Sequence, residues 1–181
     1  MVSNKQLGAI GETAVMLELL KMGFDVININ NSYNNYRKAD LICMNPNNEK
    51  SVKIQVKTGT TNNILTGFVS ELDGTIPKIE ENIIGPWVFV KIDKDNLSKY
   101  EFYILTKEEV LTLITTSNKW YVTDWNRTLT SKPIVGINVN WLEGEGEEES
   151  KTHLTKQHKK YINPLGHNSK DNWKKIINLL L

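Results

Sequence analysis

The chain of 181 residues is long enough for one domain of ordinary size with a buried core. Hydrophobic residues make up 39% of it and charged residues 24%, which is typical of a soluble globular protein. No apolar run approaches the roughly 20 residues of a membrane-spanning helix, so we expect no membrane segment. The single cysteine, Cys43, excludes an internal disulfide and favours a reducing, cytoplasmic setting.

The formal net charge of +1 gives no general signature of nucleic-acid binding, but the charges are unevenly placed. Residues 143–149 contain five acids, and residues 151–181 contain seven lysines. We expect the acidic segment to be a solvated loop. The lysine-rich tail could approach phosphate groups, or it could be an ordinary solvated face.

The N-terminal segment predicts a helix. Ser3 and Gln6 form a capping-box pattern, and Gly23 has the position of a C-terminal cap. An apolar stripe at helical spacing is formed by Leu7, Ile10, Ala14 and Leu17. Glu12 points away from this stripe, and Gly8, one turn earlier, leaves space over its carboxylate. From the helix alone, Glu12 could equally be a surface acid.

Two short apolar runs, over residues 39–44 and 51–57, flank a segment rich in turn-forming residues and predict a β-hairpin. With a symmetric loop, Asp40 lies opposite Gln55. Because side chains alternate along a strand, Gln55 and Lys57 share one face. The hairpin therefore brings a carboxylate, an amide and an ammonium to one patch of the sheet.

The rest of the chain predicts further elements. Strands are expected over residues 24–29, 87–92, 100–105, 120–122 and 134–139. Helices are expected from Pro77 to Ile84, after a Thr106 cap, and after a Ser169 cap, the last with Trp173, Ile176, Ile177 and Leu180 facing the core. Residues 30–38 predict a loop, and residues 64–85 give no clear pattern.

The polar groups of the hairpin suit a hard cation. Mg²⁺ takes oxygen ligands and keeps several waters, so one or two carboxylates suffice. Asp40 supplies a carboxylate, Gln55 an amide oxygen, and the main-chain carbonyl of Val56 a further ligand if the sheet edge is unpaired there. Glu12 could contribute directly or through water. Lys57 could position an attacking water or stabilise charge on a phosphate.

Each of these residues also has a plainer interpretation. Asp40 could cap backbone groups at the start of a strand, Gln55 could be a structural amide, and Lys57 a solvated lysine. Arg37 and Lys38, just before the acid, could contact phosphate or serve as counter-charges. The spacing from Asp40 to Lys57 is a weak signal when taken alone.

Together with the upstream helix, the signal is stronger. The segments Gly-Ala-Ile-Gly-Glu ending at Glu12, Lys-Ala-Asp ending at Asp40, and Gln-Val-Lys-Thr starting at Gln55 resemble the PD-(D/E)xK nuclease superfamily. The resemblance covers residues 3–92 and implies the restriction-endonuclease-like fold, a mixed α/β architecture. Its αβββαβ core has a central mixed sheet flanked by helices, and the remaining chain forms a C-terminal extension.

The chain departs from the superfamily pattern at two positions. Ala39 stands where the pattern has proline, which is a common variation. Gln55 replaces an acid, which removes one negative charge and should weaken cation binding. This Gln-x-Lys version resembles branches that include Holliday-junction resolvases, and it places more of the metal binding on Glu12 and Asp40.

The resemblance implies an endonuclease that uses Mg²⁺, or Mn²⁺, to hydrolyse DNA phosphodiesters in restriction, repair or recombination. The expected catalytic residues are Asp40, Gln55, Lys57 and Glu12, and the expected metal ligands are Asp40, Gln55, Glu12 and the Val56 carbonyl. DNA contacts are expected at Arg37, Lys38 and Thr58.

We further expect a nuclease-like core over residues 1–117 and an extension over residues 118–181 packed on it. Cutting both strands of a duplex favours a homodimer. The alternative is a weak or inactive nuclease-fold domain that binds nucleic acid or a protein partner.

Overall fold

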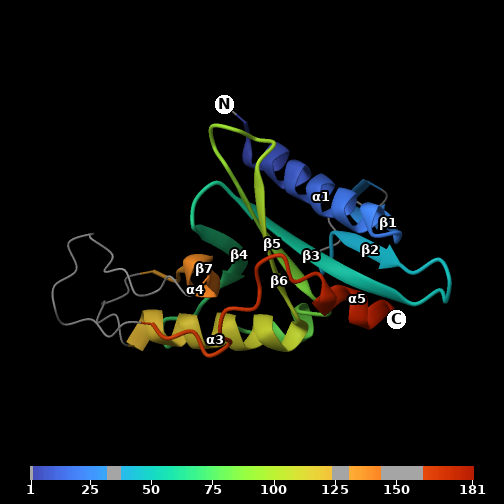
Figure 1. Cartoon of the computed structure of the whole chain (residues 1–181). Coiled ribbons are helices and arrows are strands. Elements are labelled where there is room, and N and C mark those ends of the chain that lie inside the picture. The colour runs from blue at the N-terminus through green and yellow to red at the C-terminus, as the bar shows by residue number, and fades with distance from the viewer. Residues whose placement is uncertain (1, 32–37, 124–130, 144–160) are drawn as a thin grey trace.

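The structure, a computed structural model, describes residues 2–31, 38–123, 131–143 and 161–181 (Figure 1). The helices are α1 (Asn4–Lys21), the 3-10 turn η1 (Ile29–Asn31), α2 (Ile79–Asn82), α3 (Lys107–Thr123), α4 (Asn140–Glu143) and α5 (Lys174–Leu180). The strands are β1 (Asp25–Asn28), β2 (Leu41–Met44), β3 (Ser51–Gly59), β4 (Asn63–Val69), β5 (Trp87–Ile92), β6 (Tyr100–Leu105) and β7 (Ile134–Asn138).

Five of the strands form one mixed sheet in the order β1-β2-β3-β5-β6. Neighbouring strands are antiparallel except for β3 and β5, which are parallel. β4 pairs with β7 in a separate two-stranded ribbon. The expected α/β class with a central mixed sheet is confirmed.

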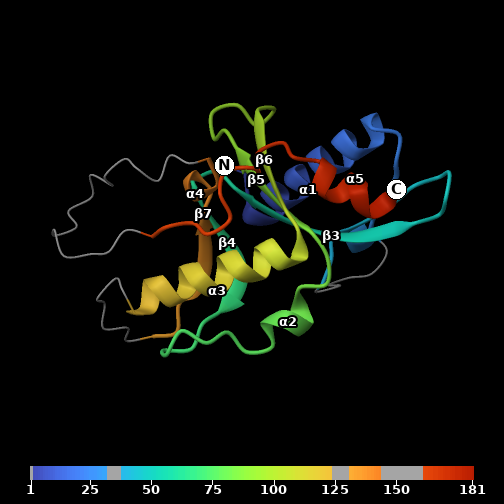
Figure 2. The ribbon, with the colours of Figure 1, turned by 60° about the horizontal axis from the view of Figure 1, so that its bottom comes forward.

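The sheet is covered on both faces, and the alternation along β5 shows how. Val88 and Val90 pack into the core that contains α1 and α5, whereas Trp87 and Phe89 pack into a second core with α3. Figures 1 and 2 show α1 and α3 on opposite sides of the sheet. A strand buried on both faces has continuous apolar sequence, which is why the apolar run over residues 87–92 predicts this strand.

Helix α1 begins as predicted. The Ser3 side chain accepts a hydrogen bond from the Gln6 N–H, and the Gln6 side chain accepts one from the Ser3 N–H. The buried face, however, is made by Gly11, Ala14, Val15 and Leu19. Leu17 of the predicted stripe is 50% exposed. Leu7, Ile10 and Ala14 of the stripe do pack in the core, so the stripe is wrong only at Leu17, because the helix carries apolar residues around much of its circumference.

Two other predictions are wrong in part, and the segment that gave no pattern contains a strand. Residues 120–122 lie in α3 and form no strand, because the helix continues to Thr123 and Trp120 packs edge-on against Trp141. The unreadable segment 64–85 contains β4. The last helix begins at Lys174, and Ser169 instead uses its carbonyl to accept the Ile104 N–H of β6.

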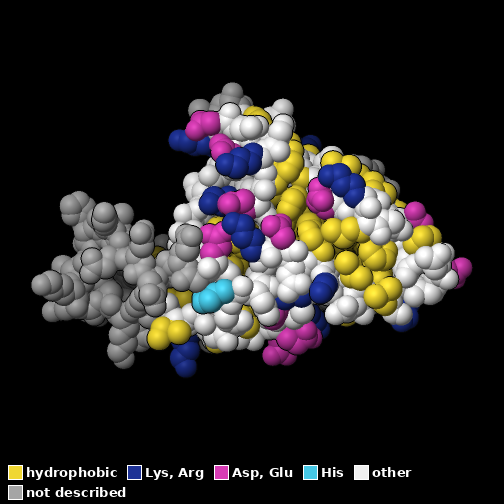
Figure 3. Space-filling model, in the orientation of Figure 1, with side chains coloured by type: hydrophobic (Ala, Val, Ile, Leu, Met, Phe, Trp, Pro, Cys, Tyr) yellow, Lys and Arg dark blue, Asp and Glu magenta, His cyan; other side chains and the backbone are white. Residues whose placement is uncertain are grey.

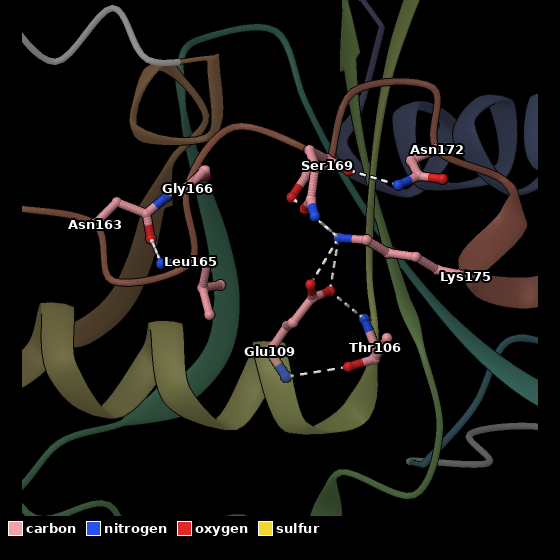
Figure 4. A network of polar contacts seen from close by, with 9 residues as sticks. Thr106, Glu109, Asn163, Leu165, Gly166, Ser169, Asn172 and Lys175 are labelled. Carbon is pink, nitrogen blue, oxygen red and sulfur yellow. Dashed lines mark hydrogen bonds and ion pairs between the residues drawn. The ribbon is translucent and has the colours of Figure 1, made fainter.

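The segment before α5 is fastened to the sheet and to α3 (Figure 4). Lys175 Nζ lies 2.9 and 2.7 Å from the two carboxylate oxygens of Glu109, and its side chain is 9% exposed. Glu109 also caps α3 by accepting the Thr106 N–H at 2.8 Å, while its own N–H donates to the Thr106 hydroxyl. One carboxylate therefore joins the start of α3 to α5.

A second charged group ties α4 to the β5–β6 hairpin. Lys170 pairs with Glu101 at 3.1 Å and with Glu143, whose carboxylate also accepts the Tyr103 hydroxyl at 2.7 Å. Figure 3 shows Lys and acidic side chains intermingled on this face. The pairing of β7 with β4 likewise joins the C-terminal part to earlier strands, and the division at residue 117 stays a prediction. Within the described ranges, no helix has the length and apolar character needed to cross a membrane.

The Glu109–Lys175 pair gives a stability prediction. Lys175→Ala should lower the free energy of unfolding by about 2 kcal/mol, because it leaves a half-buried carboxylate without its cation. Lys174→Ala, next to it and exposed, should change stability by less than about 0.5 kcal/mol. Urea denaturation followed by circular dichroism measures both, and equal effects of the two variants would contradict the assigned role.

Candidate metal-dependent active site

The hairpin of β2 and β3 has the predicted register. Met44 pairs with Ser51 and Leu41 with Ile54, which sets Asp40 opposite Gln55 just beyond the ladder. The Asp40 N–H donates to the Ile54 carbonyl at 2.9 Å and continues the pairing by one residue.

The carboxylate of Asp40 turns back onto the third strand. Its Oδ2 accepts the Val56 N–H at 2.7 Å and a hydrogen bond from Gln55 Nε2. Asp40 and Gln55 are each 8% exposed, so this contact is buried. A buried carboxylate that accepts a backbone N–H is held firmly in one orientation.

Glu12 reaches the same place from α1. Its Oε2 accepts Asn28 Nδ2 at 2.8 Å, and its Oε1 accepts Asn30 Nδ2 at 3.2 Å. Asn30 Nδ2 also donates to Asp40 Oδ1 at 3.0 Å. One amide nitrogen therefore links the two acids that the sequence predicted to act together.

The open edge of β3 is a consequence of the short neighbour β2. The ladder with β2 ends at Ile54, and the N–H of Val56 is taken by the Asp40 side chain instead of a strand. Because the N–H and C=O of one strand residue point to the same edge, the Val56 carbonyl faces the side on which Asp40 lies. Among the described strands none pairs with this edge beyond Ile54, and the role of the Val56 carbonyl as a ligand stays a prediction.

Lys57 lies on the Gln55 face of β3. Its ammonium is 5.4 Å from the centre of the Trp87 ring, and a side chain at Gly67 of β4 would come within 3.8 Å of it. Burial lowers the pKa of Lys57 below its usual range, while Asp40 and Glu12 act in the opposite direction. Among the described ion pairs under 4.0 Å, none joins Lys57 to either acid.

The electrostatics of the two acids favour a cation. Burial raises the pKa of Glu12, the hydrogen bond from Asn28 lowers it, and the negative charge of Asp40 raises it further. Two carboxylates that share an amide donor away from bulk water still repel one another. A divalent cation at this position would remove that repulsion.

The donor set fits Mg²⁺ or Mn²⁺. Two carboxylates, a glutamine amide and a main-chain carbonyl are all oxygen donors, and Mg²⁺ needs only one or two carboxylates together with water and substrate oxygens. Within the described parts of the chain, no three His, Cys, Asp or Glu side chains gather into a larger cluster. The described part of the candidate site therefore contains two acids, Glu12 and Asp40, and their role as metal ligands stays a prediction.

Helix α1 comes very close to β3 beside these residues. A Cβ atom at Gly11 would fall 2.0 Å from the Thr58 hydroxyl oxygen and 3.0 Å from the Thr58 Cβ. Only glycine permits this approach, which brings Glu12, the next residue, to the sheet edge. Thr58, predicted to contact DNA, packs under α1 here, and its role toward DNA stays a prediction.

The remaining predicted contacts are distributed differently. Lys38 is exposed and donates to the Glu81 carbonyl at 3.1 Å, whereas Arg37 lies outside the described residues. Sequence reasoning missed Asn28 and Asn30. Asn28 ends strand β1 and Asn30 lies in the turn η1 that follows, and the signal that could have found them is a pair of asparagines where the first strand ends, upstream of Asp40.

A small pocket lies elsewhere, between α3, β7 and α4, with a volume of about 170 Å³. Its lining includes Trp120, Tyr121, Trp141 and Asn118, and it shares no residue with the acids above. We assign no chemistry to it, because the described lining contains no acid, histidine or lysine.

The chain matches no known family model, and no curated protein matches it in sequence. Among solved structures it is similar to a bacterial homing endonuclease, I-Ssp6803I, with a TM-score of 0.51 and 16% identity. The match covers 99% of this chain and 95% of that chain. This chain has the restriction-endonuclease-like fold. The likeness establishes the fold, and the chemistry rests on the residues of the site.

The approach of α1 to β3 is testable with two glycines of the same helix. Gly11→Ala should lower the free energy of unfolding by about 1–3 kcal/mol, because the new methyl group collides with Thr58. Gly8→Ala meets no atom within 4 Å and should raise stability by up to about 1 kcal/mol through helix propensity. Thermal and urea unfolding of both variants measure this, and a neutral Gly11→Ala would contradict the close contact.

Proposed function

We propose that this protein is a metal-dependent endonuclease that hydrolyses phosphodiester bonds of DNA. The observation that carries the proposal is the placement of Glu12 and Asp40 around one amide nitrogen, at an open sheet edge beside Gln55, Val56 and Lys57. The restriction-endonuclease-like fold and its likeness to a homing endonuclease support it.

Each residue has a role that its position allows. Asp40 and Glu12 hold the cation, and the Val56 carbonyl and Gln55 side-chain oxygen complete the protein ligands. A bound Mg²⁺ would supply Lewis acidity toward the phosphate and lower the pKa of its water. Lys57, next along the same strand face, stabilises the charge that develops on the phosphate or orients the attacking water.

The amide nitrogen of Gln55 donates a hydrogen bond to the Asp40 carboxylate. The nitrogen must face the carboxylate, since an amide oxygen there would be repelled. Gln55 therefore orients Asp40, and its own oxygen remains the weaker, uncharged ligand. We infer that the acids carry most of the cation affinity.

The decisive experiment compares Asp40→Asn and Lys57→Met with the wild-type protein on a random-sequence plasmid library in Mg²⁺ or Mn²⁺. Both variants should cleave at least about 100-fold more slowly. Matched exposed controls, Asp95→Asn and Lys94→Met, should cleave as the wild type does. Gel electrophoresis of the plasmid and sequencing of the cut ends measure the rates and the sites.

The Lys57 variant also separates chemistry from folding. The folded protein depresses the pKa of Lys57. The charged lysine therefore lowers the free energy of unfolding at pH 7, and this loss of stability becomes smaller as the pH rises toward the pKa of Lys57 in the unfolded state. Lys57→Met should therefore keep or raise the free energy of unfolding while activity is lost.

Two results would contradict the proposal. One is undiminished cleavage by both site variants. The other is a wild-type protein that binds DNA or a protein partner, binds no Mn²⁺ in calorimetry and cleaves nothing, which would establish the binding domain that Gln55 leaves open.

A further inference from the structure

The strongest unexplained feature of the molecule is the side chain of Asn30. Within the described residues it alone touches both carboxylates, with Nδ2 3.2 Å from Glu12 Oε1 and 3.0 Å from Asp40 Oδ1. No part of the proposed chemistry uses this amide.

The surrounding backbone fixes Asn30 in place. Its N–H donates to Asn28 Oδ1 at 2.9 Å, and Asn28 Nδ2 donates to Glu12 at 2.8 Å. Between them, the Ile29 N–H donates to the Asp40 carbonyl at 2.8 Å. The segment from Asn28 to Asn30 is therefore tied to both acids. The orientation of the two amides follows from chemistry, because an oxygen facing either carboxylate would be repelled.

The arrangement leaves each of the four carboxylate oxygens with an amide donor. Asp40 Oδ2 has Gln55 and Val56, Glu12 Oε2 has Asn28, and the remaining two oxygens share Asn30. The shared donor is neutral, although it lies between two anions. This is the position that a divalent cation would favour, and a cation and an amide nitrogen cannot both occupy the space between the same two oxygens.

We propose that Asn30 is a positioning residue that acts as a neutral placeholder. It holds Glu12 and Asp40 together in the metal-free protein, and a divalent cation displaces its amide nitrogen on binding. The displacement rests on the proposed function, whereas the placeholder role in metal-free protein is independent of it.

The first experiment is done in EDTA, without metal. Asn30→Asp sets three carboxylates together and should lower the melting temperature by at least about 5 °C. Adding Glu12→Gln should restore a substantial part of this loss, because it removes one of the three charges. The matched control is Asn45→Asp, since Asn45 is 6% exposed and donates to the Leu180 carbonyl far along the chain.

In the Asn45→Asp control, adding Glu12→Gln should restore none of the lost melting temperature. The placeholder role is overturned if Glu12→Gln rescues Asn30→Asp no better than Asn45→Asp, since Asn30 would then be an ordinary structural asparagine.

The second experiment measures Mn²⁺ affinity by calorimetry. Asn30→Ala should bind Mn²⁺ at least as tightly as the wild type, because no hydrogen bonds to the acids have to be broken. Asn30→Asp should bind about tenfold more tightly through the added charge, and Asn45→Asp should match the wild type. A threefold or greater loss of affinity in Asn30→Ala would overturn displacement and make Asn30 a metal ligand.

The outcomes separate this inference from the proposed function. A wild-type protein that binds Mn²⁺ with the expected order of variants but cleaves no DNA contradicts the nuclease and leaves Asn30 as a placeholder. A wild-type protein that binds no Mn²⁺ overturns displacement and the metal site together, and the EDTA experiment then decides the placeholder role alone.

Discussion

The contact on which the site depends is the one between the Asp40 carboxylate and the Val56 N–H. β2 begins at Leu41, and its ladder with β3 ends at the pair of Leu41 and Ile54, so the edge of β3 after Ile54 would expose unpaired backbone groups. Asp40 supplies the missing acceptor with its side chain, so the end of a short strand becomes the place where a carboxylate is fixed. Gln55 adds a second donor to the same oxygen. The site is thus built on a sheet edge that the fold leaves incomplete.

The two cores explain why the open edge of β3 lies between helix α1 and the ribbon of β4 and β7. Alternate residues of β3 and β5 belong to opposite faces, so Ile54 and Val56 pack under α1 while Lys57 lies over Trp87 and next to Gly67 of β4. The acid from α1 approaches from one face and the lysine from the other.

Burial at this site destabilises the charged forms of Glu12 and Lys57. The pKa values of Glu12 and Lys57 are both shifted toward the neutral forms by burial. Neutral amides from Asn28 and Asn30 offset part of the cost for the acids. The folded protein thus keeps unfavourable charges at one site and stabilises itself elsewhere, for example through the Glu109–Lys175 pair.

The sequence by itself determined the hairpin, its register, the strands at residues 87–92 and 100–105, and the grouping of Asp40 with Gln55, because period-two alternation and a short turn are local properties. The resemblance also named Glu12 and the fold. Only the tertiary structure decided that Gly11 lets α1 touch Thr58, that β4 pairs with β7, and that Trp120 continues a helix. Asn30 became visible in the same way. Its role depends on residues 10 and 18 positions away, and no local pattern records such a contact.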